Sequence, residues 1–321
     1  MKPSGWSHAS LSVANWLTSL PAVMKPAAHG FYSKGCLSGA IAIPVDGPNW
    51  QSMRLSRNRR WGHPELIKIV VDLSEKAKKI GWNGLMVGDI SQPRGGPMLS
   101  GHASHQLGLD ADIWLNPMPN RRLTYKEREN TSAVSMLKGR YRVNEKIWTK
   151  THAGLIKAAA TFPQVERVLV HPGIKKKLCD TTKGDRSWLR KVRPYWGHHY
   201  HMHVRMGCPK GSVGCRRQAA TPAGTGCDKS LQWWFDVALK PPKKIKRPKG
   251  WKPPKVKRKR QTRMSDLPGA CRAVLGAPAP ANEKLATLQL AGGRSVVPVL
   301  KAVKAVGFGG AVPLPTFRPK N

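Results

Sequence analysis

Residues 196–209 read WGHHYHMHVRMGCP, and the alternation inside this stretch determines how the chain is expected to fold. Residues two apart on a β-strand point to the same face. His201, His203 and Arg205 therefore share one face, and the other face carries Tyr200, Met202 and Val204. This pattern predicts a half-buried strand of an antiparallel sheet, with two imidazoles side by side.

An earlier stretch, residues 100–114, carries a matching set of polar side chains and reads SGHASHQLGLDADIW. The alternation at its end also predicts a strand, on which Asp110 and Asp112 point the same way. His105 comes just before this strand, in a predicted turn. The Gly- and Pro-rich run ahead of it is expected to form the loop that presents His102 and His105.

The two stretches contain the donors that a catalytic zinc site requires. Such a site takes three protein ligands, leaves one position open for water and places a base nearby. One of His201 and His203 would bind the metal, while the other, titrating near ~6.5, accepts a proton from the water. Only one carboxylate is needed, so Asp110 is interpreted as an orienting group. The isolated histidines fit hydrogen-bonded core positions: His29, His63, His152 and His171.

Similarity to a known family extends well beyond these ligand candidates. It is carried by QSMRLSRNRRWGHPEL (51–66), GDISQPRGGPMLSGHASHQLGLDADIW (88–114) and DRSWLRKVRPYWGHHYHMHVRMGCP (185–209). These stretches resemble the penicillin-insensitive murein endopeptidases, which are grouped with lysostaphin-like enzymes and D-Ala-D-Ala carboxypeptidases among the zinc peptidases. The resemblance runs from about Gly35 to about Phe235, and Cys271 adds to it.

The resemblance implies a serine-independent zinc metallopeptidase. Its expected reaction is hydrolysis of D-alanyl-meso-diaminopimelyl cross-links in peptidoglycan, through zinc-bound hydroxide and a histidine base. By the family pattern, the metal ligands would be His105, Asp112 and His203, and the base would be His201. No H-E-x-x-H helix is present, so the glutamate base of those metalloproteases is absent.

Two further histidines, His102 and His198, are implied to flank the site as catalytic groups, and His102 is an alternative ligand. Some relatives hold a second metal through an Asp and a His placed between the two stretches. Residues 138–143 here read KGRYRV and contain neither, so one Zn²⁺ per chain is predicted.

Two alternatives to an endopeptidase stay open at this point. One is a D-Ala-D-Ala carboxypeptidase or dipeptidase of the same zinc group. The other is a cationic, non-catalytic polyanion-binding protein with a structural metal. A structural zinc site is normally closed by four protein ligands, whereas the surplus histidines here favour an open, catalytic site.

The chain is strongly basic, with 56 Lys and Arg against 17 Asp and Glu and a net charge of +39. Such a charge suggests a polyanionic partner. The surplus is densest from Lys240 to Arg263, but no zinc finger, helix-turn-helix or RNP signature accompanies it, so no specific nucleic-acid partner is predicted. The candidates for binding substrate carboxylates, otherwise surface charges, are Arg54, Arg57, Arg94 and Arg193.

Six cysteines fit a disulfide framework in an oxidising compartment, although composition alone allows 15 pairings. The resemblance implies Cys36–Cys271, Cys179–Cys227 and Cys208–Cys215, and a periplasmic location. Residues 1–28 contain only a broken apolar stretch and no evident signal peptide, so a misplaced start or an atypical leader is expected. No transmembrane segment and no oligomeric state are predicted.

The order of expected elements is mixed rather than a repeated β-α-β, which favours an α+β fold. A central antiparallel sheet would carry the zinc site, flanked by helices and long loops. The expected divisions are a poorly ordered segment 1–30, a zinc peptidase domain 31–238, a Lys/Pro-rich linker 239–264 and a C-terminal extension 265–321 that Cys271 tethers to the domain. Helices are expected near 64–81, 146–160, 172–179 and 186–192.

Overall fold

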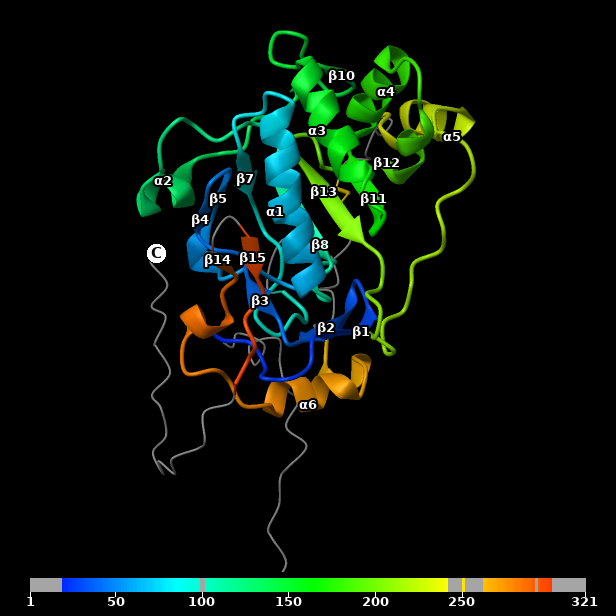
Figure 1. The fold of residues 1–321 in the computed structure, drawn as a ribbon. Coiled ribbons are helices and arrows are strands. Elements are labelled where there is room, and N and C mark those ends of the chain that lie inside the picture. The colour runs from blue at the N-terminus through cyan, green and yellow to red at the C-terminus, as the bar shows by residue number, and fades with distance from the viewer. Residues whose placement is uncertain (1–18, 99–101, 242–249, 252–261, 292–293, 302–321) are drawn as a thin grey trace, which may run out of the picture.

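A computed structural model describes residues 19–98, 102–241, 250–251, 262–291 and 294–301. The expectations for segment 1–30 and for the linker 239–264 therefore fall in large part outside the described residues, as do residues 302–321 of the C-terminal extension. Within them, the α+β class is confirmed (Figure 1).

A seven-stranded mixed sheet forms the centre of the molecule, with strand order β12-β11-β13-β8-β7-β5-β4. Within the four central strands, the pairs β11–β13, β13–β8 and β8–β7 are antiparallel, as the alternation predicted. Parallel pairs flank them, β12 beside β11 and β5 beside β7. The bounds are β4 Asp46–Gly47, β5 Trp50–Ser52, β7 Leu85–Val87, β8 Asp110–Trp114, β11 Val165–Val170, β12 Val192–Pro194 and β13 His201–Met206.

Two helices, α1 (Pro64–Lys79) and α3 (Lys150–Ala160), lie against each other and across one face of this sheet (Figure 1). The sequence explains where α1 begins, because His63 caps it by accepting from the Glu65 amide and Pro64 occupies its first position. Its buried stripe has helical spacing and includes Leu66, Ile69, Val70, Leu73 and Ala77.

The two faces of the sheet differ in chemistry. Alternate residues of β8, β11 and β13 pack beneath the two helices: Ala111, Ile113, Val168, Val170, Met202 and Val204. Their polar neighbours point to the opposite face. The prediction that β13 is a half-buried strand was wrong, because all six of its residues, on both faces, are buried. Residues from the His102 loop and the 218–222 segment line the space over that face.

Shorter elements surround this core, and the expected helix at 186–192 is only a 3-10 turn, η3 (Ser187–Lys191). The remaining strands are β1 Ala27–Phe31, β2 Lys34–Ser38, β3 Ile41–Ala42, β6 Trp61–Gly62, β9 Leu137–Lys138, β10 Arg142–Val143, β14 Gln289–Ala291 and β15 Arg294–Val296. The remaining helices and turns are η2 Leu55–Arg57, α2 Tyr125–Asn130, α4 Pro172–Thr181, α5 Lys229–Trp233, η4 Trp234–Ala238, η5 Met264–Asp266, α6 Ala270–Gly276 and η6 Glu283–Ala286. No helix in the described ranges has the length and hydropathy needed to cross a membrane.

Three disulfides form the pairs that the resemblance implies: Cys36–Cys271, Cys179–Cys227 and Cys208–Cys215. The Cys36–Cys271 disulfide joins β2 to α6, its two cysteines are 235 residues apart in the sequence, and both are fully buried. They form a small cluster with Ala22, Met264, Leu267 and Val274. The region after the basic linker is therefore fastened to the sheet domain.

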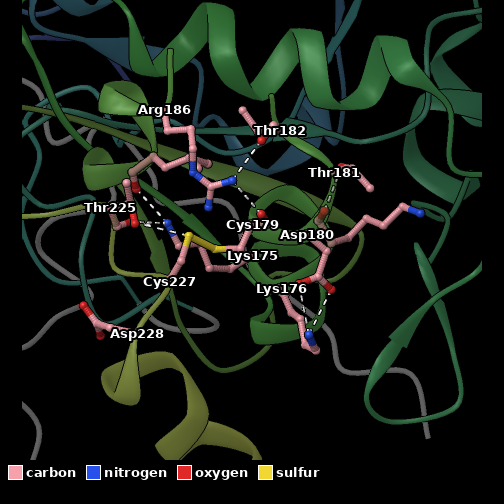
Figure 2. Close-up of a disulfide and its surroundings, with 12 residues drawn as sticks. Lys175, Lys176, Cys179, Asp180, Thr181, Thr182, Arg186, Thr225, Cys227 and Asp228 are labelled. Atoms are coloured by element: carbon pink, nitrogen blue, oxygen red, sulfur yellow. Dashed lines mark hydrogen bonds and ion pairs between the residues drawn. A yellow bond between two sulfur atoms is a disulfide. The ribbon is translucent and has the colours of Figure 1, made fainter. Parts of the chain in front are cut away.

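The Cys179–Cys227 disulfide lies beside a buried lysine (Figure 2). Lys175 is fully buried and donates from Nζ to the carbonyl oxygens of Leu189, at 2.7 Å, and Thr225, at 2.6 Å. Within the described ranges, no carboxylate lies within ion-pair distance of Lys175. Burial, together with the charges of Arg193 and Arg186, lowers the pKa of Lys175 to about 7.

Removing the long-range disulfide should cost more stability than removing the short one. Loop-closure entropy gives about 5 kcal/mol for a cross-link spanning more than 200 residues and about 2.5 kcal/mol for one spanning fewer than ten. We expect C36S/C271S to lower the free energy of unfolding by about twice as much as C208S/C215S, which breaks a link of separation 7. Urea denaturation measures both, and equal losses would contradict the expectation.

Lys175 should make stability depend on pH. Between pH 7 and 10.5 the unfolded chain still binds this proton while the folded protein has released it, so the free energy of unfolding rises with pH across that window. Relative to Lys175→Met, the wild type should gain stability from pH 7 to pH 10. Lys176→Met is the matched control, because Lys176 is exposed and paired with Asp180. Parallel stability curves for wild type and K175M would rule out a shifted lysine.

Candidate metal centre and active site

Strands β8 and β13 place their polar side chains on one face of the sheet, in register. Asp112 is paired with His203, Asp110 with Arg205 and Trp114 with His201. Directly paired residues on neighbouring strands point to the same side. The two stretches that sequence analysis singled out therefore form one surface.

His105 enters this surface from the turn that precedes β8. Its backbone is left-handed, with φ 70°, and its amide donates to Oδ2 of Asp110 at 3.0 Å. The ring is fully buried, and Nδ1 lies 2.6 Å from the carbonyl oxygen of Ile90. Because Nδ1 donates to that carbonyl, Nε2 is left with its lone pair directed at Asp112, whose Oδ1 is 3.5 Å away.

His203 is held in a similar way from the other strand. Its Nε2 lies 2.9 Å from Oδ1 of Asp110, and its Nδ1 lies 3.1 Å from Oδ1 of Asp112. A carboxylate behind a histidine fixes the ring and its tautomer, which is the usual second layer around a metal-binding imidazole. Asp110 thus takes the orienting position that its place in the sequence suggested.

The donor atoms of His105, Asp112 and His203 fit a metal ion. Nε2 of His105 and Oδ1 of Asp112 are buried, and neither has a hydrogen-bond partner among the described residues. Two ligands of a tetrahedral zinc are about 3.3 Å apart when each is about 2.0–2.1 Å from the ion. The separations of 3.1 Å and 3.5 Å from Asp112 to His203 and His105 are close to that value.

His102 adds a fourth donor residue to the group. One donor atom each from His102, His105 and Asp112 lie within 4.8 Å of one another. Nδ1 of His102 is 3.7 Å from Oδ2 of Asp112, and its Nε2 lies 2.9 Å from Oδ2 of Asp89. With 22% of its side chain exposed, His102 lies at the mouth of the site and not at its base.

Asp89 is a site residue that the sequence analysis missed. It lies two residues after β7 and accepts from His102, Arg57 and Arg59. Burial opposes ionisation of Asp89, but these partners hold its pKa down at about 2. A carboxylate close to the end of a buried strand was the available signal.

His201 and His198 lie beside the donor group. Nε2 of His201 is 3.6 Å from Oδ1 of Asp112, and the rings of His201 and His198 are 4.8 Å apart between centroids. His198 has a left-handed backbone, with φ 32°, and its Nδ1 lies 2.6 Å from the carbonyl oxygen of Trp196. Burial lowers the pKa of both rings, to about 3 for His198, so both are neutral at neutral pH and able to accept a proton.

The two buried carboxylates are ionised because their partners outweigh the effect of burial. Burial alone would raise the pKa of Asp110, but Arg205 and His203 lower it well below its usual value. The pKa of Asp112 is also held well below its usual value, because the neighbouring imidazoles, His105 first among them, outweigh its burial. The guanidinium of Arg205 contacts both oxygens of Asp110, at 2.7 Å and 3.1 Å.

Two cavities meet at this centre, and His102 lines both. One, of about 280 Å³, is lined by Arg54, Arg57, Asp89, Trp114 and His201 among others. The other, of about 690 Å³, is lined by Tyr195, His198, His203 and Arg193 among others. A larger cavity lies at the β9–β10 hairpin and α4, and contains none of the site residues. The site therefore opens in two directions, as a substrate extending on both sides of a reacting bond requires.

The structure separates the four arginines proposed for carboxylate binding. Arg54 and Arg57 line the smaller cavity and Arg193 lines the larger one. The interpretation was wrong for Arg94, which is 4% exposed and lines neither cavity. Its Nη1 donates to three carbonyl oxygens at the end of α6, those of Val274, Leu275 and Ala277, which have no helical partners of their own.

Comparison with known proteins places this centre in a family. The model of the penicillin-insensitive murein endopeptidase family matches residues 28–276. A penicillin-insensitive murein endopeptidase of Haemophilus influenzae is 44% identical over 220 residues, 68% of this chain and 77% of the relative. One from Klebsiella pneumoniae subsp. pneumoniae is 40% identical over 248 residues, 77% of this chain and 85% of the relative. The chain therefore belongs to the penicillin-insensitive murein endopeptidase family.

Proposed function

We propose that this protein is a zinc-dependent endopeptidase that hydrolyses D-alanyl-meso-diaminopimelyl cross-links in peptidoglycan. His105, Asp112 and His203 would hold one Zn²⁺, with His102 as an alternative fourth ligand. The observation that carries the proposal is the pair of buried atoms without partners, Nε2 of His105 and Oδ1 of Asp112, beside Nδ1 of His203. Family membership supports the substrate.

The bound ion would supply a Lewis acid and lower the pKa of water at the site. His201 accepts the proton of the attacking water, because its ring is neutral and directed at Asp112. The ring of His198 lies beside that of His201, 4.8 Å away between centroids, and with His102 it borders the reacting carbonyl. Asp110, Asp89 and the Ile90 carbonyl hold the imidazoles of His203, His102 and His105, so little reorganisation is needed when substrate binds.

A carboxypeptidase of the same zinc group is the second candidate. Such an enzyme removes a terminal residue and needs room for a longer peptide on one side only. The two separate cavities that adjoin the proposed metal site favour an internal bond instead. A purely structural metal is disfavoured, because the donor group opens into both cavities through His102.

Peptidoglycan as substrate implies a location outside the cytoplasmic membrane, and we propose the periplasm. The three disulfides support this compartment, because disulfides persist where the surroundings are oxidising.

Metal removal should abolish cleavage. Purified cross-linked muropeptide dimers should be converted to monomers, a chelator should stop the reaction, and added Zn²⁺ should restore it. Elemental analysis should find one zinc per chain, and Asp112→Asn should lose it because a buried anionic ligand is removed. Asp72→Asn, an exposed acid paired with Lys68, is the control. Loss of a terminal D-Ala from pentapeptides without dimer cleavage would identify the carboxypeptidase instead.

His201→Ala should separate chemistry from metal binding. We expect the variant to keep its zinc and to lose about 10²- to 10⁴-fold in kcat, the usual contribution of a positioned base. His199→Ala is the control, because His199 is a neighbouring histidine whose Nδ1 bonds to Ser135 outside both cavities. Zinc content and dimer cleavage are measured on the same preparations. Full activity in H201A would remove His201 from the mechanism.

A further inference from the structure

Among the residues that the structure describes, the larger of the two site cavities is lined by arginines and by no acidic side chain. Its basic residues are Arg167, Arg193 and Arg205, besides the histidines of the metal centre. Building on the proposed function, we infer that Arg193 binds a carboxylate of the substrate in this cavity and so selects peptides that carry one near the scissile bond.

The sheet register places Arg193 in line with the metal centre. Arg193 pairs with Leu169, Leu169 with His203, and His203 with Asp112, across four adjacent strands. The four side chains therefore project from one face in a single row. Neighbouring strands are about 4.8 Å apart, so two strand spacings put the backbone of Arg193 about 10 Å from that of His203. An extended peptide covers about three residues in that distance.

Of the three arginines that line the larger cavity, Arg193 is the one whose guanidinium has no hydrogen bond or ion pair within the described ranges. Arg205 is engaged by both oxygens of Asp110 and by Gln218. Arg167 donates to the carbonyl of Ala219 and lies 3.8 Å from Glu166. Within the described ranges, no hydrogen bond or ion pair engages the guanidinium of Arg193, although it contributes to the lowered pKa of Asp228. A free, planar guanidinium in a cleft is suited to bind a carboxylate with two parallel hydrogen bonds.

The backbone at Gly226 packs closely against the guanidinium of Arg193. Gly226 has φ 66°, and a Cβ on it would lie 2.6 Å from Nη1 of Arg193, so a larger residue there would displace the guanidinium. The segment around Gly226 is fastened on both sides, by the Cys227–Cys179 disulfide and by the bond from Lys175 to the Thr225 carbonyl (Figure 2). Both fastenings come from α4, so Gly226 limits where the guanidinium can lie.

The test uses two stem tetrapeptides that cannot be cleaved and that differ only at the side-chain carboxylate of meso-diaminopimelate, which is free in one and a carboxamide in the other. Calorimetry with the zinc-loaded protein should show about 10- to 100-fold tighter binding of the carboxylate form, the range expected of a charge-assisted hydrogen-bonded pair. Arg193→Gln should abolish that preference, and Arg193→Lys should restore part of it. Arg142→Gln removes the same charge from an exposed position on the β9–β10 hairpin, and this variant should keep the preference for the carboxylate form.

Gly226→Ala gives an independent variant with a close control. It should weaken the carboxylate preference by displacing the guanidinium, whereas Gly224→Ala should not. Gly224 has the same kind of backbone, with φ 79°, but nothing lies within 4 Å of its Cβ position, so the control carries the backbone strain without the clash. Thermal denaturation should show similar loss of stability from that strain in both variants.

The outcomes separate this inference from the proposed function. A preference that survives in R193Q, or that is absent from the wild type, overturns the role of Arg193 whether or not the enzyme cleaves dimers. Cleavage of dimers made with free and with amidated carboxylates then extends the result to turnover. We expect R193Q to raise KM for the free form while leaving kcat on the amidated form unchanged, and an equal effect on both forms would contradict the inference.

Discussion

The cleft depends on the buried carboxylate of Asp110. It is fully inaccessible to solvent and accepts from the His105 amide, from Nε2 of His203 and from the guanidinium of Arg205. An ionised carboxylate in the protein interior is tolerated only when its bonds are satisfied, so these partners act as a set. They come from the turn before β8 and from β13. Satisfying one carboxylate thus fixes the pairing of two strands and the orientation of two imidazoles.

The features that the sequence could predict are those with a local period. Alternation located β8 and β13 and placed His203 and Asp112 on one face, because a period of two depends only on neighbouring residues. Strands β5 and β12 have three residues each, too few to display a period, so the parallel pairings were missed. Arg94 is placed by contacts to the distant α6, which leave no mark on the residues beside it.

Composition also overstates how much positive charge the protein can offer to a partner. The net charge of +39 counts every basic residue alike. Arg94 and Lys175 are buried against backbone carbonyls, and Arg205 is neutralised by Asp110. These cations hold the fold and the site together and are not available to a polyanion. The positive charge that a substrate encounters comes from guanidinium groups that have no partner among the residues that the structure describes.

The two cavities differ in their acidic side chains. The lining of the smaller one includes Asp89, which Arg57 shares with Arg59 and His102, while Arg54 donates to the Thr131 carbonyl. Among the described residues, the lining of the larger one has no acidic side chain, and Arg193 faces it. Under the proposed function, a cross-linked peptide is asymmetric about its scissile bond, so a cleft that is more cationic at one end would favour one direction of binding. That direction would decide which carbonyl lies beside His201, and a charge two strands away from the metal ligands would thereby help to select the bond that is cut.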